Sequence, residues 1–94
     1  MFFEWDEVKE QKNITKHKLD FKTAMLVFRD EHRIEFYDEK HSIDEDRYIT
    51  IGSVNGTLLI LMVVYTERGD AMRIISARKA TSQERRQYYD QNES

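Results

Sequence analysis

The spacing of apolar residues changes several times along the chain, and each change marks a predicted element. Residues 2–5, FFEW, form a short apolar run that predicts a first strand. A polar helix is predicted over residues 7–17, because Asp6 is a favourable N-cap and an acid follows it in the first turn. Val8 and Ile14 are the only clear apolar positions of this helix, so we expect its buried face to be thin.

A second helix is predicted after Asp20, which is again a favourable N-cap. Four apolar side chains follow at i, i+3, i+4 and i+7, which places them on one helical face; they are Phe21, Ala24, Met25 and Phe28. This stripe is typical of core packing.

From Ile34 the spacing changes to alternation, which is typical of strands. Ile34 and Phe36 alternate with polar neighbours, and residues 48–51 predict a further strand with its isoleucines on one face. Between them lies an acidic stretch, residues 38–46, which we interpret as a flexible surface loop.

Two turn signals organise the second half of the chain. Asn55-Gly56 is the strongest short hairpin signal, and residues 58–65 are apolar on both alternating faces. They therefore predict a central strand that is covered on both sides. A tight turn over residues 66–70, around Gly69, connects it to an antiparallel strand over residues 72–77.

The last helix is predicted from Thr81 to about residue 90, because Thr81-x-x-Glu84 fits a capping box. The order of elements predicts an α+β fold: a small antiparallel β-sheet with two N-terminal helices and one C-terminal helix, mostly on one face. We expect a single domain over residues 1–94 with a core of about 2–90. We expect either the C-terminal helix or another protein chain to cover the far side of the central strand.

Composition narrows the class of protein. The 94 residues include no cysteine, which excludes disulfides, thiolate metal sites and cysteine nucleophiles. The longest apolar run, residues 58–65, is far shorter than the roughly 20 residues that cross a bilayer. The N-terminus lacks the basic and apolar pattern of a signal peptide. We expect a soluble, cytoplasmic protein without a membrane partner, a cofactor or a metal.

Charge is distributed unevenly. Residues 66–86 carry six Lys or Arg and three acids, a net charge of +3, whereas the whole chain carries −3. A local cationic patch on an acidic protein suggests an anionic ligand.

Several sequence blocks form a recognisable set: Glu4-Trp5-Asp6-x-x-Lys9, Asn13-x-x-Lys16-His17, Phe21-x-x-Ala24-x-x-Val27-Phe28, Arg47-Tyr48-Ile49-x-Ile51-Gly52 and the long run from Tyr65 to Arg86. Together they resemble the BrnT family, the toxins of bacterial type II toxin–antitoxin pairs. The resemblance implies a RelE-like fold and a metal-independent endoribonuclease. It also implies a BrnA-type antitoxin partner with a ribbon-helix-helix DNA-binding region. Lys18 stands where family members often have glycine, a position typical of a helix C-cap.

RNA cleavage without a metal needs a base for the ribose 2′-hydroxyl, cations for the developing phosphate charge and an acid for the leaving 5′-oxygen. Arginine suits the second role because its planar fork matches phosphate oxygens. The candidate catalytic residues are Arg73, Arg78, Arg68, Lys16, His17 and Glu67, and the candidate phosphate-binding residues are Lys79, Arg85 and Arg86.

Structural roles remain open for these candidates. Arg73 could pair with Glu67 or Asp70. Arg85 and Arg86 could form a solvated helix face. Lys16 and His17 could simply interact with the dipole of the helix that they end. We interpret His41 as surface.

Strict alternation places Arg73 and Lys79 on one face of their strand and Arg78 on the other. The three converge only if that strand twists, bulges or ends early.

Two functions follow. The first is an endoribonuclease toxin that inhibits translation and growth, neutralised by its antitoxin. The alternative is a non-catalytic binding module that acts as corepressor and reaches operator DNA only through the antitoxin.

Overall fold

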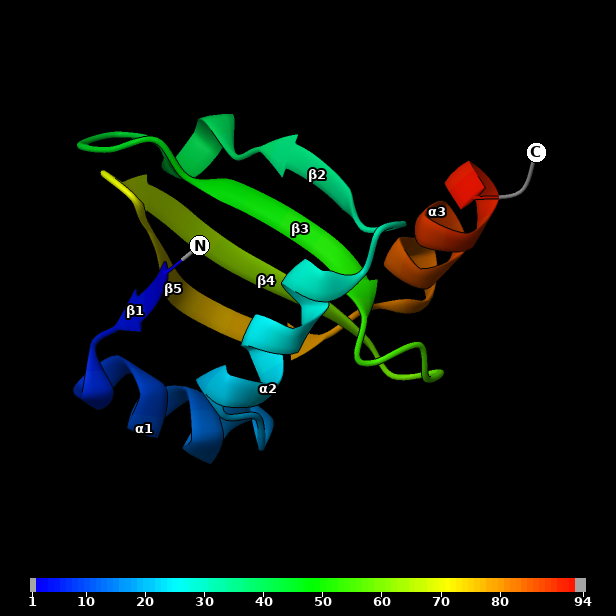
Figure 1. The fold of residues 1–94 in the computed structure, drawn as a ribbon, viewed down its shortest axis with the longest axis horizontal. Coiled ribbons are helices and arrows are strands. Elements are labelled where there is room, and N and C mark those ends of the chain that lie inside the picture. The colour runs from blue at the N-terminus through cyan, green and yellow to red at the C-terminus, as the bar shows by residue number, and fades with distance from the viewer. Residues whose placement is uncertain (1, 93–94) are drawn as a thin grey trace.

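The computed structural model describes residues 2–92 and contains the predicted elements in the predicted order (Figure 1). The strands are β1 (Phe2–Trp5), β2 (Ile34–Tyr37), β3 (Tyr48–Ser53), β4 (Ile60–Arg68) and β5 (Ala71–Lys79). The α-helices are α1 (Glu7–His17), α2 (Phe21–Met25) and α3 (Ser82–Asn92), with 3₁₀ turns η1 (Leu26–Arg29) and η2 (Glu39–His41). Among residues 2–92, no helix has both the length and the hydrophobicity needed to cross a membrane.

The strands form one sheet in the order β1-β5-β4-β3-β2. All neighbouring strands are antiparallel except β1, which runs parallel to β5. The predicted α+β class is confirmed, but its sheet is mixed rather than wholly antiparallel. No short turn joins β1 to β5, so connectivity does not force the two strands to run in opposite directions.

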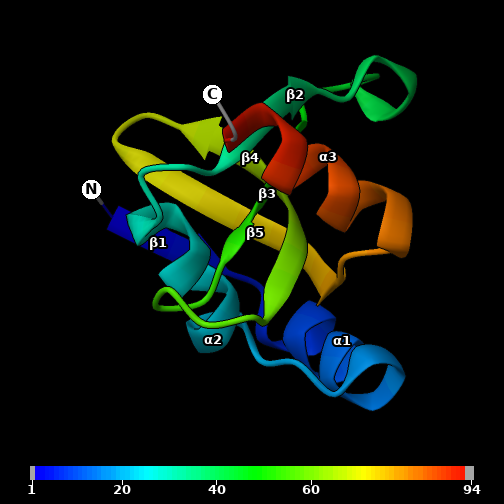
Figure 2. The same ribbon diagram turned by 90° about the vertical axis from the view of Figure 1, so that its right-hand side faces the viewer.

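The two faces of the sheet are covered differently. On one face, here called the helix face, α1 and α2 lie against β4 and β5, and the core there includes Phe21, Ala24, Leu61, Val63 and Ile74. Figure 2 shows α3 on the other side of the sheet.

We call that other side the open face, because α3 covers only one end of it. Tyr88 of α3 packs there against a cluster of Ile34, Ile51, Ile60 and Met62. The C-terminal helix therefore covers part of the far side of the central strand. The helices leave the rest of the open face uncovered, and the candidate site lies there.

Local signals placed the starts of the helices correctly. Asp6 accepts hydrogen bonds from the first turn of α1, and Asp20 accepts one from Thr23 N–H in α2. The predicted capping box closes through both of its bonds, from Thr81 N–H to the Glu84 carboxylate and from Glu84 N–H to the Thr81 hydroxyl.

Positive φ angles occur where turns and caps require them. Lys18 ends α1 in the left-handed region with φ 61°, and Gly69 has φ 57° in the hairpin between β4 and β5.

Three details of the structure differ from what the apolar pattern predicted. Val8 is 64% exposed, so it is not a buried position of α1, and the buried residue of that helix is Asn13. Leu58 is 78% exposed because β4 begins at Ile60, and β4 continues through Arg68 so that the turn is shorter than predicted. The second helix is α-helical only to Met25 and continues as the 3₁₀ turn η1.

Asn13 closes the edge of β5 beyond the end of β1. The pairing of β1 with β5 reaches only Ile74. Further along that edge, Ala77 N–H donates to Asn13 Oδ1 at 3.0 Å, and Asn13 Nδ2 donates to the carbonyls of Ala77 at 2.9 Å and Leu19 at 3.0 Å. The side-chain amide thus takes the place of a neighbouring strand.

Candidate functional site

A β-bulge decides which side chains of β5 reach the open face. Val64 lies opposite Ser76 and Tyr65 lies opposite Ile74, so Ile75 is an extra residue without a partner in β4. Ile74 and Ala77 consequently both face the helix-side core, although they are three residues apart.

The bulge changes the predicted distribution of cations. Arg73 lies opposite Thr66, and Arg78 lies opposite Met62 of the open-face cluster, so both arginines belong to the open face. Lys79 lies opposite Leu61 of the helix-face core, so it belongs to the helix face and not to the face of the two arginines. The bulge therefore brings Arg73 and Arg78 to the same face and leaves Lys79 on the other.

A third arginine, Arg47, joins this face from the loop that directly precedes β3. The pairing of β3 with β4 begins at Tyr48 and Tyr65, and Arg47 and Thr66 are the next residues beyond that pair. Thr66 lies opposite Arg73, which in turn lies opposite Glu4. Arg47 directly precedes β3 and Arg73 lies in β5, so the two arginines flank β4 from opposite sides.

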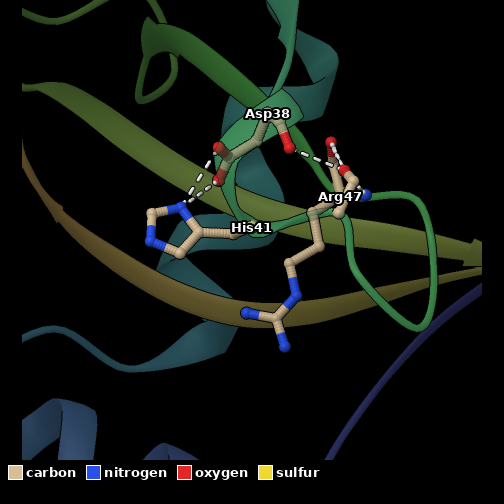
Figure 3. A network of polar contacts seen from close by, with 4 residues as sticks. Asp38, His41 and Arg47 are labelled. Atoms are coloured by element: carbon tan, nitrogen blue, oxygen red, sulfur yellow. Dashed lines mark hydrogen bonds and ion pairs between the residues drawn. The ribbon is translucent and has the colours of Figure 1, made fainter.

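The open face is hollowed beside Arg47 and Arg78, whereas Arg73 lies outside the hollow. The hollow has a volume of about 340 Å³ and a largely apolar floor, and it is lined by Asp38, His41, Arg47, Ile49, Met62, Val64, Ile75, Ser76 and Arg78. Figure 3 shows the side chains of His41 and Arg47 extending from one loop toward the strands.

Hydrogen bonds organise the loop that carries His41 and Arg47. Asp38 N–H donates to the Arg47 carbonyl at 2.8 Å, and the Ser42 hydroxyl donates to the Asp38 carbonyl at 2.6 Å while accepting from Arg47 N–H at 2.8 Å. The Asp38 carboxylate meets His41 Nδ1 at 3.0 and 3.1 Å (Figure 3). Hydrogen bonds between residues 38, 42 and 47 therefore hold both ends of the stretch that we predicted as a flexible acidic loop.

Three of the arginines predicted as site residues have carboxylate partners. Arg78 binds Glu84 through two hydrogen bonds of 2.7 and 3.0 Å, whereas Arg73 lies 3.8 Å from Glu4 and Arg68 lies 3.4 Å from Glu45. The partner of Arg73 is thus Glu4, rather than either of the two acids considered from sequence. Among residues 2–92, the Arg47 guanidinium has no ion pair.

Glu84 connects the open face to the start of α3. Its carboxylate accepts from both Arg78 and Thr81 N–H. Partial burial acts to raise the pKa of Glu84, but the hydrogen bonds and charge of Arg78, with those of Thr81, hold that pKa below its ordinary value.

Replacing Glu84 with glutamine is therefore expected to remove a contribution to stability that depends on pH. A carboxylate with a lowered pKa in the folded state stabilises the fold above its unfolded pKa, and the contribution is lost as pH falls through the folded value. The unfolding free energies of the parent and Glu84→Gln should differ by about 1 kcal/mol near neutral pH, a figure that allows for solvent screening. The difference should shrink as pH falls below 4.5.

Urea unfolding at pH 7 and pH 3 measures this difference, with Glu31→Gln, a change at an exposed acid, as the matched control. A difference of equal size at the two pH values would contradict the role given to the Glu84 charge.

The remaining predicted residues lie away from the hollow. Lys16 and His17 end α1, which packs in the helix layer, and Glu67 lies opposite Met72 beside a different hollow of about 600 Å³. That hollow is lined by three acids and one arginine, Arg33, which already donates to Glu35 and Thr50. Its charge does not suit a phosphate.

The arginines of α3 are also separate from the hollow. Arg85 donates to the Leu58 carbonyl at 3.0 Å and lies over the Tyr89 ring, and Arg86 is exposed. Among residues 2–92, no group of three His, Asp or Glu side chains is arranged to hold a metal ion.

Sequence reasoning missed His41, Arg47 and Ser76, which line the hollow of the candidate site. The acidic neighbours of His41 suggested plain surface, and Arg47 entered only as part of a family block. The useful signal was the hairpin itself: strands over residues 34–37 and 48–51 that pair in register bring residues 38 and 47 together.

Comparison with known proteins relates the chain to one family and to a solved structure. A family model described as the ribonuclease toxin BrnT of type II toxin–antitoxin systems matches residues 5–84. The chain is also similar to the crystal structure of the Brucella abortus ribonuclease toxin BrnT, with a TM-score of 0.66 and 32% sequence identity, covering 87% of this chain and 100% of that one. A search of curated proteins found no match. The matched range includes Arg47, Arg73 and Arg78.

Proposed function

Because the chain belongs to the BrnT family of ribonuclease toxins of type II toxin–antitoxin systems, we propose that it is a metal-independent endoribonuclease that inhibits translation and growth. The observation that supports this function most directly is the gathering of Arg47, Arg73 and Arg78 on the one sheet face that the helices leave partly uncovered.

These arginines can hold a phosphate from more than one side. Arg47 has no ion pair among residues 2–92, and the 3.8 Å separation of Arg73 from Glu4 is too long for a hydrogen bond. Arg78 is held by Glu84 and the Lys79 carbonyl, but its Nε–H and one Nη2–H remain without a partner among those residues. Fixed guanidinium groups of this kind stabilise the charge that develops on phosphate oxygens during transfer.

The hollow also suits the other parts of a nucleotide. Its floor is apolar, formed by Ile49, Met62, Val64 and Ile75, and can pack against a ribose or a base. Attack by the neighbouring 2′-hydroxyl on phosphorus, with departure of the 5′-oxygen, requires no water or metal as nucleophile. This chemistry restricts cleavage to RNA, because DNA lacks the 2′-hydroxyl.

The purified protein should cut an RNA oligonucleotide in buffer containing EDTA and leave the DNA oligonucleotide of the same sequence intact. The 5′ fragments should end in a 2′,3′-cyclic phosphate, which mass spectrometry identifies. An intact RNA substrate would favour the alternative function of a non-catalytic corepressor, and cleavage abolished by EDTA would contradict a metal-independent reaction.

A type II toxin has an antitoxin, and we take the partner of this chain to be of BrnA type, with operator DNA reached only through it. The open face combines cations with an apolar floor, which fits an acidic and apolar antitoxin segment. Binding there in the cytoplasm would cover the proposed site. In the same assay, a saturating amount of antitoxin should stop cleavage, and a fully active complex would show that the antitoxin binds elsewhere.

A further inference from the structure

The histidine on the rim of the hollow has the surroundings of a general base. His41 lies in η2, and its side chain is 59% exposed, whereas its partner Asp38 is only 12% exposed. Arg47, Ser76 and Arg78 line the same hollow, so a phosphate held by these arginines lies beside the imidazole ring.

Asp38 determines which nitrogen of His41 is available. Both Asp38 carboxylate oxygens approach Nδ1, at 3.0 and 3.1 Å (Figure 3). An ionised carboxylate only accepts hydrogen bonds, so Nδ1 must carry the proton of the neutral ring. The lone pair is then on Nε2, which has no hydrogen-bond partner among residues 2–92. A carboxylate that fixes the tautomer of a histidine in this way orients it for proton transfer.

We infer that His41, positioned by Asp38, is the catalytic base that removes the proton from the ribose 2′-hydroxyl. This inference rests on the proposed ribonuclease function. The 2′-oxygen forms a bond to phosphorus as its proton passes to Nε2, and the bond from phosphorus to the 5′-oxygen breaks. The 5′-oxygen takes a proton from water, and the imidazolium returns its proton to solvent. The products are a 2′,3′-cyclic phosphate and a 5′-hydroxyl.

None of the residues predicted from sequence for proton transfer competes for this role on the open face. Lys16 and His17 lie in the helix layer, and Glu67 lines the acidic hollow. Among residues 2–92, Asp38 is the only carboxylate residue that lines the hollow of about 340 Å³, and it already pairs with His41 Nδ1.

His41→Ala should cut RNA at least 100-fold more slowly than the parent, the usual contribution of a general base. Added imidazole should restore part of the rate, because it can take the proton in the space that the side chain leaves. A DNA oligonucleotide of the same sequence, which cannot react, should bind the parent and His41→Ala with equal affinity. His32→Ala, a change at an exposed histidine outside this hollow, is the matched control and should keep the full rate.

Several outcomes would overturn the inference. They are a His41→Ala rate within threefold of the parent, a loss of rate matched by weaker binding of the DNA oligonucleotide, and a lost rate that imidazole does not restore. In all three the parent still cuts RNA, so the proposed function stands. A parent protein that leaves RNA intact refutes the proposed function itself, and the role of His41 with it.

Discussion

Replacing Arg73 or Arg78 with alanine is expected to lower kcat/KM for RNA cleavage by about 100- to 1,000-fold in each variant. Each change removes a cation from the face where we propose that phosphate charge develops, and among residues 2–92 no other Lys or Arg is paired across the strands with Met62 or Thr66 to replace it. Growth arrest on expression should disappear in parallel.

The matched control is Arg86→Ala, because Arg86 is an exposed arginine of α3 outside the hollow. It should keep nearly the full rate. Both site variants should remain folded, since Arg73 and Arg78 are partly exposed and their ion pairs contribute about 1 kcal/mol or less. Circular dichroism and urea unfolding check this point. If Arg73→Ala and Arg78→Ala both cut RNA as fast as the parent, the open face is not the site of cleavage.

The fold could be predicted largely because its boundaries depend on local chemistry. Asp6, Asp20 and Thr81 start helices by accepting hydrogen bonds from the next residues of the chain, so a few positions of sequence contain the whole signal. The direction of β1 had no such signal. It depends on a partner, β5, that lies some seventy positions away in the chain, as the pairing of Phe2 with Ala71 shows.

The site was only partly predictable, since it depends on how strands pair. Alternation along β5 alone assigns Arg78 to the wrong face, and the bulge at Ile75 that corrects it appears only in the register with β4. His41 was missed for a related reason. Its significance comes from Asp38 and from the strands beneath the hollow, whereas its sequence neighbours are the acids of a surface loop.

Asn13→Ala is expected to lower the unfolding free energy by about 3 kcal/mol, the largest effect on stability that we expect from one polar side chain. The change leaves Ala77 N–H and the carbonyls of Ala77 and Leu19 without their partner, and a buried unsatisfied group costs about 1–3 kcal/mol. Urea unfolding measures the difference, and Lys12→Ala, an exposed change in the preceding position of α1, should cost less than about 0.5 kcal/mol.

The same variant tests how the edge of β5 supports the open face. Ala77 lies between Ser76 and Arg78, so the amide of Asn13 holds the backbone that carries Arg78 toward the hollow. Asn13→Asp keeps an acceptor for Ala77 N–H but can no longer donate to the two carbonyls when ionised, so it cannot restore the paired edge. Both variants should therefore be destabilised. If Asn13→Ala unfolds at the same urea concentration as Lys12→Ala, water replaces the amide at this edge and Asn13 is not needed to hold β5.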